Sequence, residues 1–257
     1  GEYIQKAITF EKFLKMDFDF IIASYAGHEL AYSQLVQKYK PNAVYIRQIG
    51  NVLMRPKYCR NVLLAINTPM PPKVNYIKYH PEHHEDYYYA PPANHNVIKS
   101  FIAAPLAEPD ITLFYKYERA PEFTFKMHGI EGRDGVISGD LMPQAIKDSA
   151  FVWHVKRMGC GGFVARQALA CGRPCIIKKS YCHEYYTLTR DLFEDSVNCI
   201  DLDLGTIKEN LDKIRYFSEP DRHREMCKNT ADKFKRDVNF DDEAERIKGF
   251  LNNLLRR

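Results

Sequence analysis

The stretch from Phe151 to Ser180 holds the residues whose types and spacing are best suited to chemistry. An apolar run at 151–155 leads into a glycine-rich segment at 159–162, which a segment of helical type and a second apolar run at 175–177 follow. This order predicts a strand, a loop, a helix and a second strand parallel to the first. Unpaired backbone N–H groups at the start of such a helix, together with its dipole, favour a bound anion.

Two basic residues strengthen the expectation of an anion site. Lys156 and Arg157 come directly before the glycines, so the segment predicts a phosphate or diphosphate ligand. The run from Gly159 to Gly162 has neither the glycine spacing of the dinucleotide fingerprint nor the Gly-Lys-Ser/Thr of the Walker loop. A glycine loop that only connects a strand to a helix is therefore the alternative interpretation.

Composition narrows the class of protein. The 257 residues carry a formal charge of +4, which suits an anionic ligand but does not by itself indicate nucleic-acid binding. The seven cysteines form no C-x-x-C pair, which predicts buried free thiols in a cytoplasmic protein rather than a disulfide or zinc framework. No apolar run approaches the roughly 20 residues that a membrane span requires, so we expect no transmembrane segment.

The first part of the chain alternates between patterns typical of strands and of helices. Apolar runs predict strands at 17–24, 42–48 and 61–66, and a helix is expected at 28–39. Residues 67–96 then hold six of the 14 prolines, which predicts an interdomain connection without a strand. Within it, His80 to Asp86 could form a metal site, but adjacent side chains in a loop rarely converge on one ion, so we expect a solvated linker and no metal.

A second alternation follows from residue 97. Strands are expected at 97–103, 122–128, 151–155, 175–177 and 197–201, and helices at 108–119, 142–148, 163–171, 185–191, 204–216, 219–236 and 241–255. The fold class is therefore α/β, with two Rossmann-like doubly wound domains facing a cleft. We expect a first α/β domain with its linker at 1–92, a second at 93–240, and a helix at 241–257 that packs back on the first domain.

The segment that follows the glycines resembles a known motif. Residues 167–174, QALACGRP, are similar to the E-A-x-A-x-G-x-P of GT-B glycosyltransferases with a family 4-like donor-binding domain. Because the first domain is short and lacks an opening strand and glycine loop, the resemblance is to a divergent or phage-type member with a truncated N-terminal domain. Those enzymes commonly have Glu where this chain has Gln167, and another Glu at the position of Gly159.

The resemblance implies a role for several residues. It places the diphosphate of a nucleotide-sugar on the amides of Gly161 and Gly162, the ribose near Gln167, and Lys156 opposite the phosphates. The nucleotide-sugar would be a co-substrate, so no cofactor and no metal is expected. The implied activity is that of a hexosyltransferase acting on an acceptor hydroxyl. The acceptor stays open between a glycan, a small molecule and modified DNA.

Other candidates come from residues that follow predicted strands. His28 has a pKa range suited to a general base for the acceptor hydroxyl, or it is a solvent-facing residue at a helix start. Arg47 and Asn51 end the next strand and are expected on the acceptor side. His154 would contact the donor sugar or lie hydrogen-bonded in the core, and Arg133 would bind phosphate or lie in a surface loop.

Two further functions fit the same pattern. A nucleotide-sugar epimerase or hydrolase shares this architecture, and a non-catalytic protein that binds a nucleotide-sugar or nucleic acid agrees with the missing Glu pair.

Overall fold

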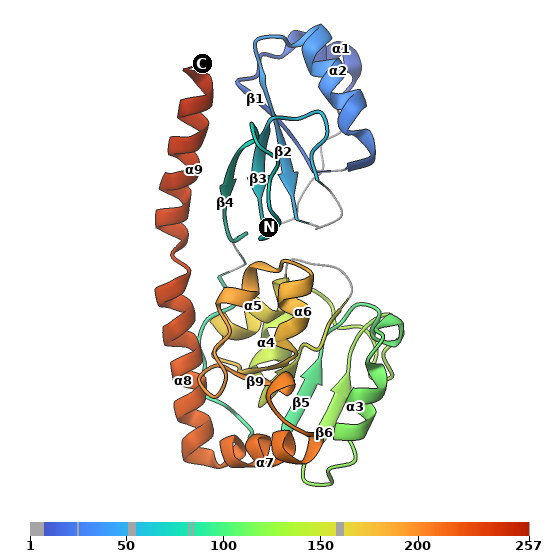
Figure 1. The fold of residues 1–257 in the computed structure, drawn as a ribbon, viewed down its shortest axis with the longest axis vertical. Coiled ribbons are helices and arrows are strands. Elements are labelled where there is room, and N and C mark those ends of the chain that lie inside the picture. The colour runs from blue at the N-terminus through green and yellow to red at the C-terminus, as the bar shows by residue number, and fades with distance from the viewer. Residues whose placement is uncertain are drawn as a thin grey trace. The chain divides into compact units, whose positions relative to one another are not determined.

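The computed structural model describes residues 8–24, 26–50, 55–81, 83, 85–157 and 162–256. The chain divides into two compact units (Figure 1). Unit 1 comprises residues 1–65, 69–79 and 241–257, and unit 2 comprises residues 66–68 and 80–240. Each unit contains one parallel sheet, as the predicted α/β class requires. No helix in the described part of the chain is long and apolar enough to cross a membrane.

Unit 1 is built on four parallel strands in the order β1-β2-β3-β4. The strands are β1 (Phe20–Ala23), β2 (Val44–Ile49), β3 (Asn61–Leu64) and β4 (Asn75–Lys78), and the helices are α1 (Phe10–Lys15), α2 (Glu29–Tyr39) and α9 (Phe240–Leu255). Helix α2 connects β1 to its neighbour β2, which gives the expected crossover between parallel strands. Apolar residues of α9, such as Phe250 and Leu251, pack on Ile46 and Leu63 and close this core.

Strand β4 corrects the interpretation of residues 67–96 as a connection without a strand. Tyr76 pairs with Val62 of β3 in a parallel register. The strand lies at the edge of the sheet and is only partly buried, so its sequence shows no apolar run. Pro71 and Pro72 come just before it, where a missing N–H group costs no ladder hydrogen bond.

Unit 2 is built on five parallel strands in the order β6-β5-β7-β8-β9. These are β5 (Val97–Ser100), β6 (Thr124–Met127), β7 (Phe151–Trp153), β8 (Cys175–Ile177) and β9 (Cys199–Asp201). Alternate residues of β7 enter two separate cores. Trp153 packs edge-on against Phe114, Tyr117 and Phe125, while Val152 lies in the other core with Ala168.

Helices cover this sheet at positions that mostly agree with the sequence patterns. They are α3 (Ile111–Tyr117), α4 (Met142–Lys147), α5 (Phe163–Ala170), α6 (Lys179–Glu184), α7 (Ile207–Ser218) and α8 (Pro220–Asp237). The prediction of a helix at 185–191 is wrong, because α6 ends at Glu184 and only a 3₁₀ turn, Leu188–Asp191, follows. Helix α6 starts early because Asp201 and Asp203 accept hydrogen bonds from the amides of Lys179 and Ser180.

The segment 80–92, expected to be a linker of the first domain, is part of unit 2. Arg173 is fully buried and donates hydrogen bonds to the carbonyl oxygens of Ala90 (2.8 Å), Pro91 (3.2 Å) and Lys147 (2.7 Å). Arg166 donates to the carbonyl oxygen of Pro81 at 2.8 Å. Two buried arginines therefore hold both ends of this segment on unit 2.

The described cysteines are all free and buried, as the sequence predicts. They are Cys59, Cys171, Cys175, Cys182, Cys199 and Cys227. Burial raises the pKa of the Cys171 and Cys182 thiols to about 11, so these groups stay protonated at neutral pH. Cys160 lies outside the described residues.

Candidate functional site

The order of the strands in unit 2 locates the candidate site. From β5 the chain turns to β6 on one side, whereas from β7 it turns to β8 on the other, so the winding reverses between β5 and β7. In open parallel sheets, ligands bind at such a reversal, beyond the carboxyl ends of the strands. Two described segments follow these strands: residues 101–110 after β5 and residues 154–157 after β7.

Gly162 ends the glycine loop expected at residues 159–162 and comes directly before helix α5. Its φ is +57°, in the left-handed region that favours glycine, and a Cβ atom there would lie 2.8 Å from Cγ2 of Thr189. As the N-cap of α5, Gly162 has no side chain that could accept a hydrogen bond from the first turn of the helix. The first-turn amides are thus available to an anion. Gly159 and Gly161 lie outside the described residues.

Lys156 and His154 precede the loop. The Lys156 side chain is half-buried, and no residue in the described part of the chain forms a hydrogen bond or ion pair with its ammonium group. Burial, and then the nearby charge of Lys156, lower the pKa of His154 to about 3. His154 is therefore neutral at pH 7, so it can exchange hydrogen bonds with hydroxyl groups but adds no positive charge.

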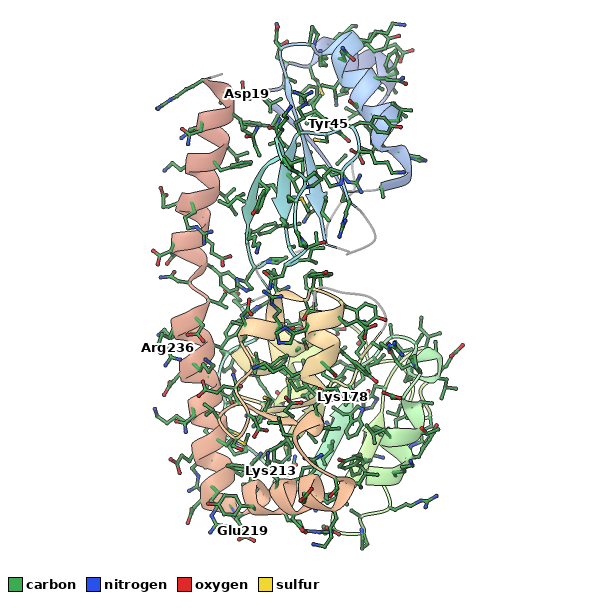
Figure 2. The ribbon with its side chains drawn as sticks, viewed as in Figure 1. Asp19, Tyr45, Lys178, Lys213, Glu219 and Arg236 are labelled. Carbon is green, nitrogen blue, oxygen red and sulfur yellow. The ribbon has the colours of Figure 1, made fainter. Side chains whose placement is uncertain are left out.

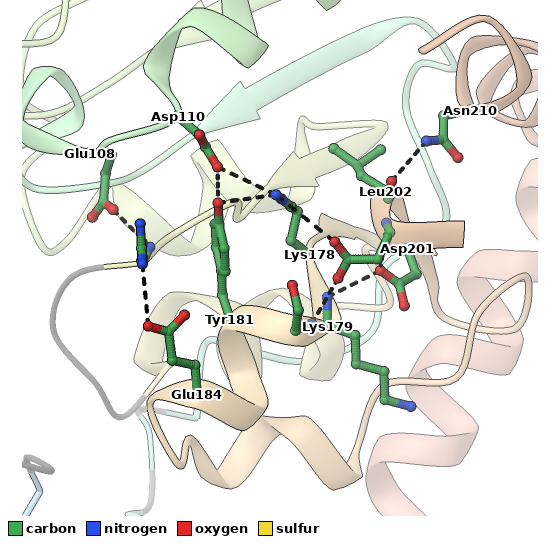
Figure 3. Close-up of polar contacts among 12 residues, drawn as sticks. Glu108, Asp110, Lys178, Lys179, Tyr181, Glu184, Asp201, Leu202 and Asn210 are labelled. Atoms are coloured by element: carbon green, nitrogen blue, oxygen red, sulfur yellow. Dashed lines mark hydrogen bonds and ion pairs between the residues drawn. The ribbon is translucent and has the colours of Figure 1, made fainter. Parts of the chain in front are cut away.

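Glu108 links the two segments of the site, and the sequence patterns did not indicate this role. Its buried carboxylate accepts a hydrogen bond of 2.7 Å from the amide of Arg157. The Arg157 guanidinium lies 3.4 Å from Glu184 of α6 (Figure 3). Glu108 thus fixes the point where the loop leaves β7. The sequence signal that could have indicated Glu108 was an acidic residue after an apolar run, a pattern that is common in exposed loops.

A second polar cluster follows β8 and was also missed from the sequence. Lys178 lies 3.5 Å from Asp110 and 4.0 Å from Asp203, and its Nζ is 3.1 Å from the hydroxyl of Tyr181, which also bonds Asp110 (Figure 3). The lysine side chain is 25% exposed, so the cluster remains open to a ligand. The Lys178-Lys179 pair directly after an apolar run was the signal that could have found it.

Arg133 and Gln167 lie in unit 2 with other contacts. The Arg133 guanidinium bonds Glu118, lies 3.3 Å from Asp134, and donates to the carbonyl oxygen of Phe125 at 2.8 Å. Gln167 lies in the second turn of α5 and is half-buried. Phosphate binding by Arg133 and ribose binding by Gln167 stay predictions.

One of the unit 1 candidates, Arg47, belongs to a buried ion pair. Glu29 and Arg47 are 4% and 1% exposed and bond each other, and the same carboxylate accepts the amides of residues 57–59 at 2.7–2.9 Å. Burial acts to raise the pKa of Glu29, but these amides and Arg47 together hold it below its usual range. Arg47 thus supports the fold of unit 1.

His28 and Asn51 complete the acceptor-side candidates. His28 is exposed at the start of α2, with its ring edge-on to Tyr32. Asn51 lies outside the described residues. Within the described part of the chain, no group of three or more His, Cys, Asp or Glu side chains is arranged to hold a metal ion.

Comparison with known proteins gives matches in structure alone. No protein-family model matches the chain, and no curated protein matches its sequence. The solved structure of TarM superposes with a TM-score of 0.70 over 94% of this chain at 12% identity. HepE from Anabaena, solved in complex with UDP, superposes with a TM-score of 0.70 over 95% of the chain at 13% identity.

Sucrose-phosphate synthase from Thermosynechococcus elongatus gives a TM-score of 0.69 over 92% of the chain at 12% identity. These proteins are GT-B glycosyltransferases. The chain has the GT-B fold. The predicted α/β fold class and the predicted resemblance to GT-B glycosyltransferases are confirmed at the level of the fold. The chain covers 57% of the length of TarM, 80% of HepE and 73% of the synthase.

Proposed function

We propose that this GT-B protein transfers a hexose from a nucleotide-sugar to an acceptor hydroxyl. In this reaction the bond between the sugar and the diphosphate breaks, a bond to the acceptor oxygen forms, and the acceptor proton passes to a base. The observation that supports the proposal is Lys156, which has no partner in the described part of the chain and precedes an uncapped helix start at the reversal of strand order. The negative charge of a departing nucleoside diphosphate needs such stabilisation.

Each candidate residue has a role in this proposal. Lys156 and the amides of Gly161, Gly162 and the first turn of α5 bind the diphosphate, and Gln167 contacts the ribose. Neutral His154 contacts the sugar, and Arg133 exchanges its present partners for phosphate. His28 is the base for the acceptor hydroxyl, and Asn51 is on the acceptor side. Arg47 contributes only through its buried ion pair with Glu29, the residue after His28. The nucleotide-sugar is a co-substrate and no further cofactor takes part.

The first test is binding of nucleoside diphosphates, measured by thermal unfolding. UDP is tested first, since HepE was solved with UDP, and then the diphosphates of guanosine, adenosine and thymidine. A diphosphate at 100 times its Kd should raise Tm by about 5 °C or more. Lys156→Ala should remove this shift, whereas Lys116→Ala, which removes an exposed lysine of α3, should keep it. The absence of a shift with every diphosphate would sink the proposal.

Turnover separates transfer from its alternatives. Incubation of the nucleotide-sugar without acceptor should leave the sugar intact, and release of an altered or free sugar would instead indicate an epimerase or hydrolase. Binding without turnover of any donor, with any acceptor, would indicate a non-catalytic protein. Gly159 and Gln167, where related enzymes commonly have Glu, give this second alternative its support.

A further inference from the structure

A groove in unit 2 lies away from the candidate donor site. It has a volume of about 560 Å³ and is lined by the tyrosines at 87–89, by Ala170 at the end of α5, and by residues of α8. The donor site is at the other end of α5, beyond Gly162. Eight helical residues span roughly 12 Å, so the groove is a separate site.

The aromatic wall of the groove is held firmly. Tyr89 lies directly on Gly172, where a Cβ atom would come within 2.5 Å of Cδ2 of the ring. The ammonium group of Lys147 lies 3.3 Å from the ring centre of Tyr88. Arg173 fixes the carbonyl oxygens of the next two residues, 90 and 91. The tyrosines are thus ordered before any ligand binds, which lowers the entropic cost of binding.

The wall is nevertheless open to a ligand. Tyr88 is 59% exposed and Tyr89 is 36% exposed. Two adjacent aromatic side chains with this exposure, in a groove of this size, give an apolar surface on which a flat ring can stack.

The opposite edge of the groove is polar. Lys228, Asp232 and Lys235 are spaced by four and three residues, which places them on one face of α8. The Lys228 and Asp232 side chains form an ion pair of 2.5 Å, and Lys235 has no partner in the described part of the chain. This edge therefore offers both donors and an acceptor, and its net charge is only about one unit.

A hydroxyl-rich ring fits this combination. A pyranose has an apolar C–H face that can lie on tyrosine and an edge of hydroxyl groups that can bond both Asp232 and Lys235. A nucleic acid fits less well, because it needs several unpaired cations along its backbone. Lys233 and Arg236 of α8 are already paired with carboxylates.

We infer that the groove lined by Tyr88, Tyr89, Asp232 and Lys235 binds a saccharide chain of the acceptor, distant from the reacting sugar. The assignment to the acceptor rests on the proposed function. It names the substrate class as an oligosaccharide or polysaccharide, long enough to occupy both the groove and the site of transfer.

The test measures binding of maltohexaose, cellohexaose and chitohexaose by saturation-transfer NMR and calorimetry, with UDP shifts recorded on the same samples. Tyr88→Ala should weaken binding of the recognised saccharide by about tenfold, and Lys235→Ala should weaken it less. The matched control is Tyr216→Ala, since Tyr216 is 51% exposed and carries Arg222 at 3.9 Å from its ring centre. The control should bind as the unchanged protein does.

Several outcomes would overturn the inference. These are no binding of any of the three saccharides, equal weakening by Tyr88→Ala and Tyr216→Ala, or preferential binding of oligothymidylate that Tyr88→Ala removes. A retained UDP shift with no saccharide binding rejects this inference alone. Saccharide binding without any diphosphate shift supports the groove and rejects the proposed transfer. A normal UDP shift in Tyr88→Ala shows that this variant is folded.

Discussion

Charged residues lie in the strands or in the segments that follow them in both sheets, but the two units use them differently. In unit 1, Glu29 and Arg47 are buried against each other and against the amides of residues 57–59. In unit 2, Lys156 is half-buried without a partner in the described part of the chain, and Lys178 is 25% exposed between two aspartates. The first set is buried and bonded to protein groups, whereas the second is exposed enough to bind a ligand.

The comparison shows that position alone does not identify a functional residue. Arg47 and Lys156 both stand near the ends of predicted apolar strands, and both are candidates from the sequence. In the structure Arg47 lies inside β2, and Lys156 follows β7. A buried ion pair whose carboxylate accepts several backbone amides mainly orders its loop, because neither charge is exposed to a ligand. A cation that keeps free donors beside a helix start retains the capacity to bind phosphate.

The largest expected effect comes from breaking the buried pair. Glu29→Ala should lower the free energy of unfolding by about 3–5 kcal/mol, because Arg47 would remain buried without its counter-charge and three amides would lose their acceptor. Thermal or urea unfolding followed by circular dichroism measures the change. Glu245→Ala, at an exposed position of helix α9 in the same unit, should change stability by less than about 1 kcal/mol. An equal effect of both substitutions would contradict the structural role of Glu29.

Gly162→Ala should be the next most damaging change, at about 2–3 kcal/mol. It combines a left-handed backbone with a Cβ atom 2.8 Å from Thr189. Gly135→Ala is the matched control, since Gly135 also has a positive φ, of 74°, but open space around its Cβ position, so only about 1 kcal/mol is expected. The variant with both Gly162→Ala and Thr189→Ala should recover part of the loss. Equal costs at the two glycines would show that Thr189 does not matter.

Acidification should lower the stability by less than these substitutions do. It removes the part that depends on the ionised carboxylate of Glu29. Its folded pKa is below the unfolded value, so its stabilisation is fully present above the unfolded pKa and is lost as pH falls through the folded pKa. The difference in Tm between the unchanged protein and Glu29→Gln should therefore shrink from about pH 7 to about pH 3. A difference that stays constant over this range would exclude the ionised carboxylate as its cause.

The smallest effect on stability is expected at Lys178. Lys178→Ala should cost less than about 1 kcal/mol, because its ion pairs are long and partly exposed. It should nevertheless weaken diphosphate binding, since Asp110 and Asp203 would then repel the ligand. Lys213→Ala is the control, with an aspartate partner at 2.7 Å and 26% exposure on a different element of unit 2 (Figure 2). Reduced UDP shifts in both variants would argue against a local role of Lys178.

Much of the fold could be predicted, because local patterns dictate it. Buried parallel strands appear as apolar runs, and amphipathic helices between them appear as apolar residues at helical spacing. Strand β4 was missed because an edge strand needs no apolar run. Helix α6 was displaced because Asp201 and Asp203, about twenty residues later in the chain, supply the acceptors for its first amides.

The sequence by itself determined the α/β class, the parallel strands and the strand-loop-helix segment whose helix contains Gln167. Each of these features depends on residues that are neighbours in the chain. Only the tertiary structure decided which charged side chains are paired with other groups of the protein. It paired Arg47 with Glu29, gathered Lys178 with Asp110 and Asp203, and clamped residues 80–92 to unit 2. The physical reason is that the burial and pairing of a charged group depend on residues far away in the chain, and sequence spacing does not encode their distance.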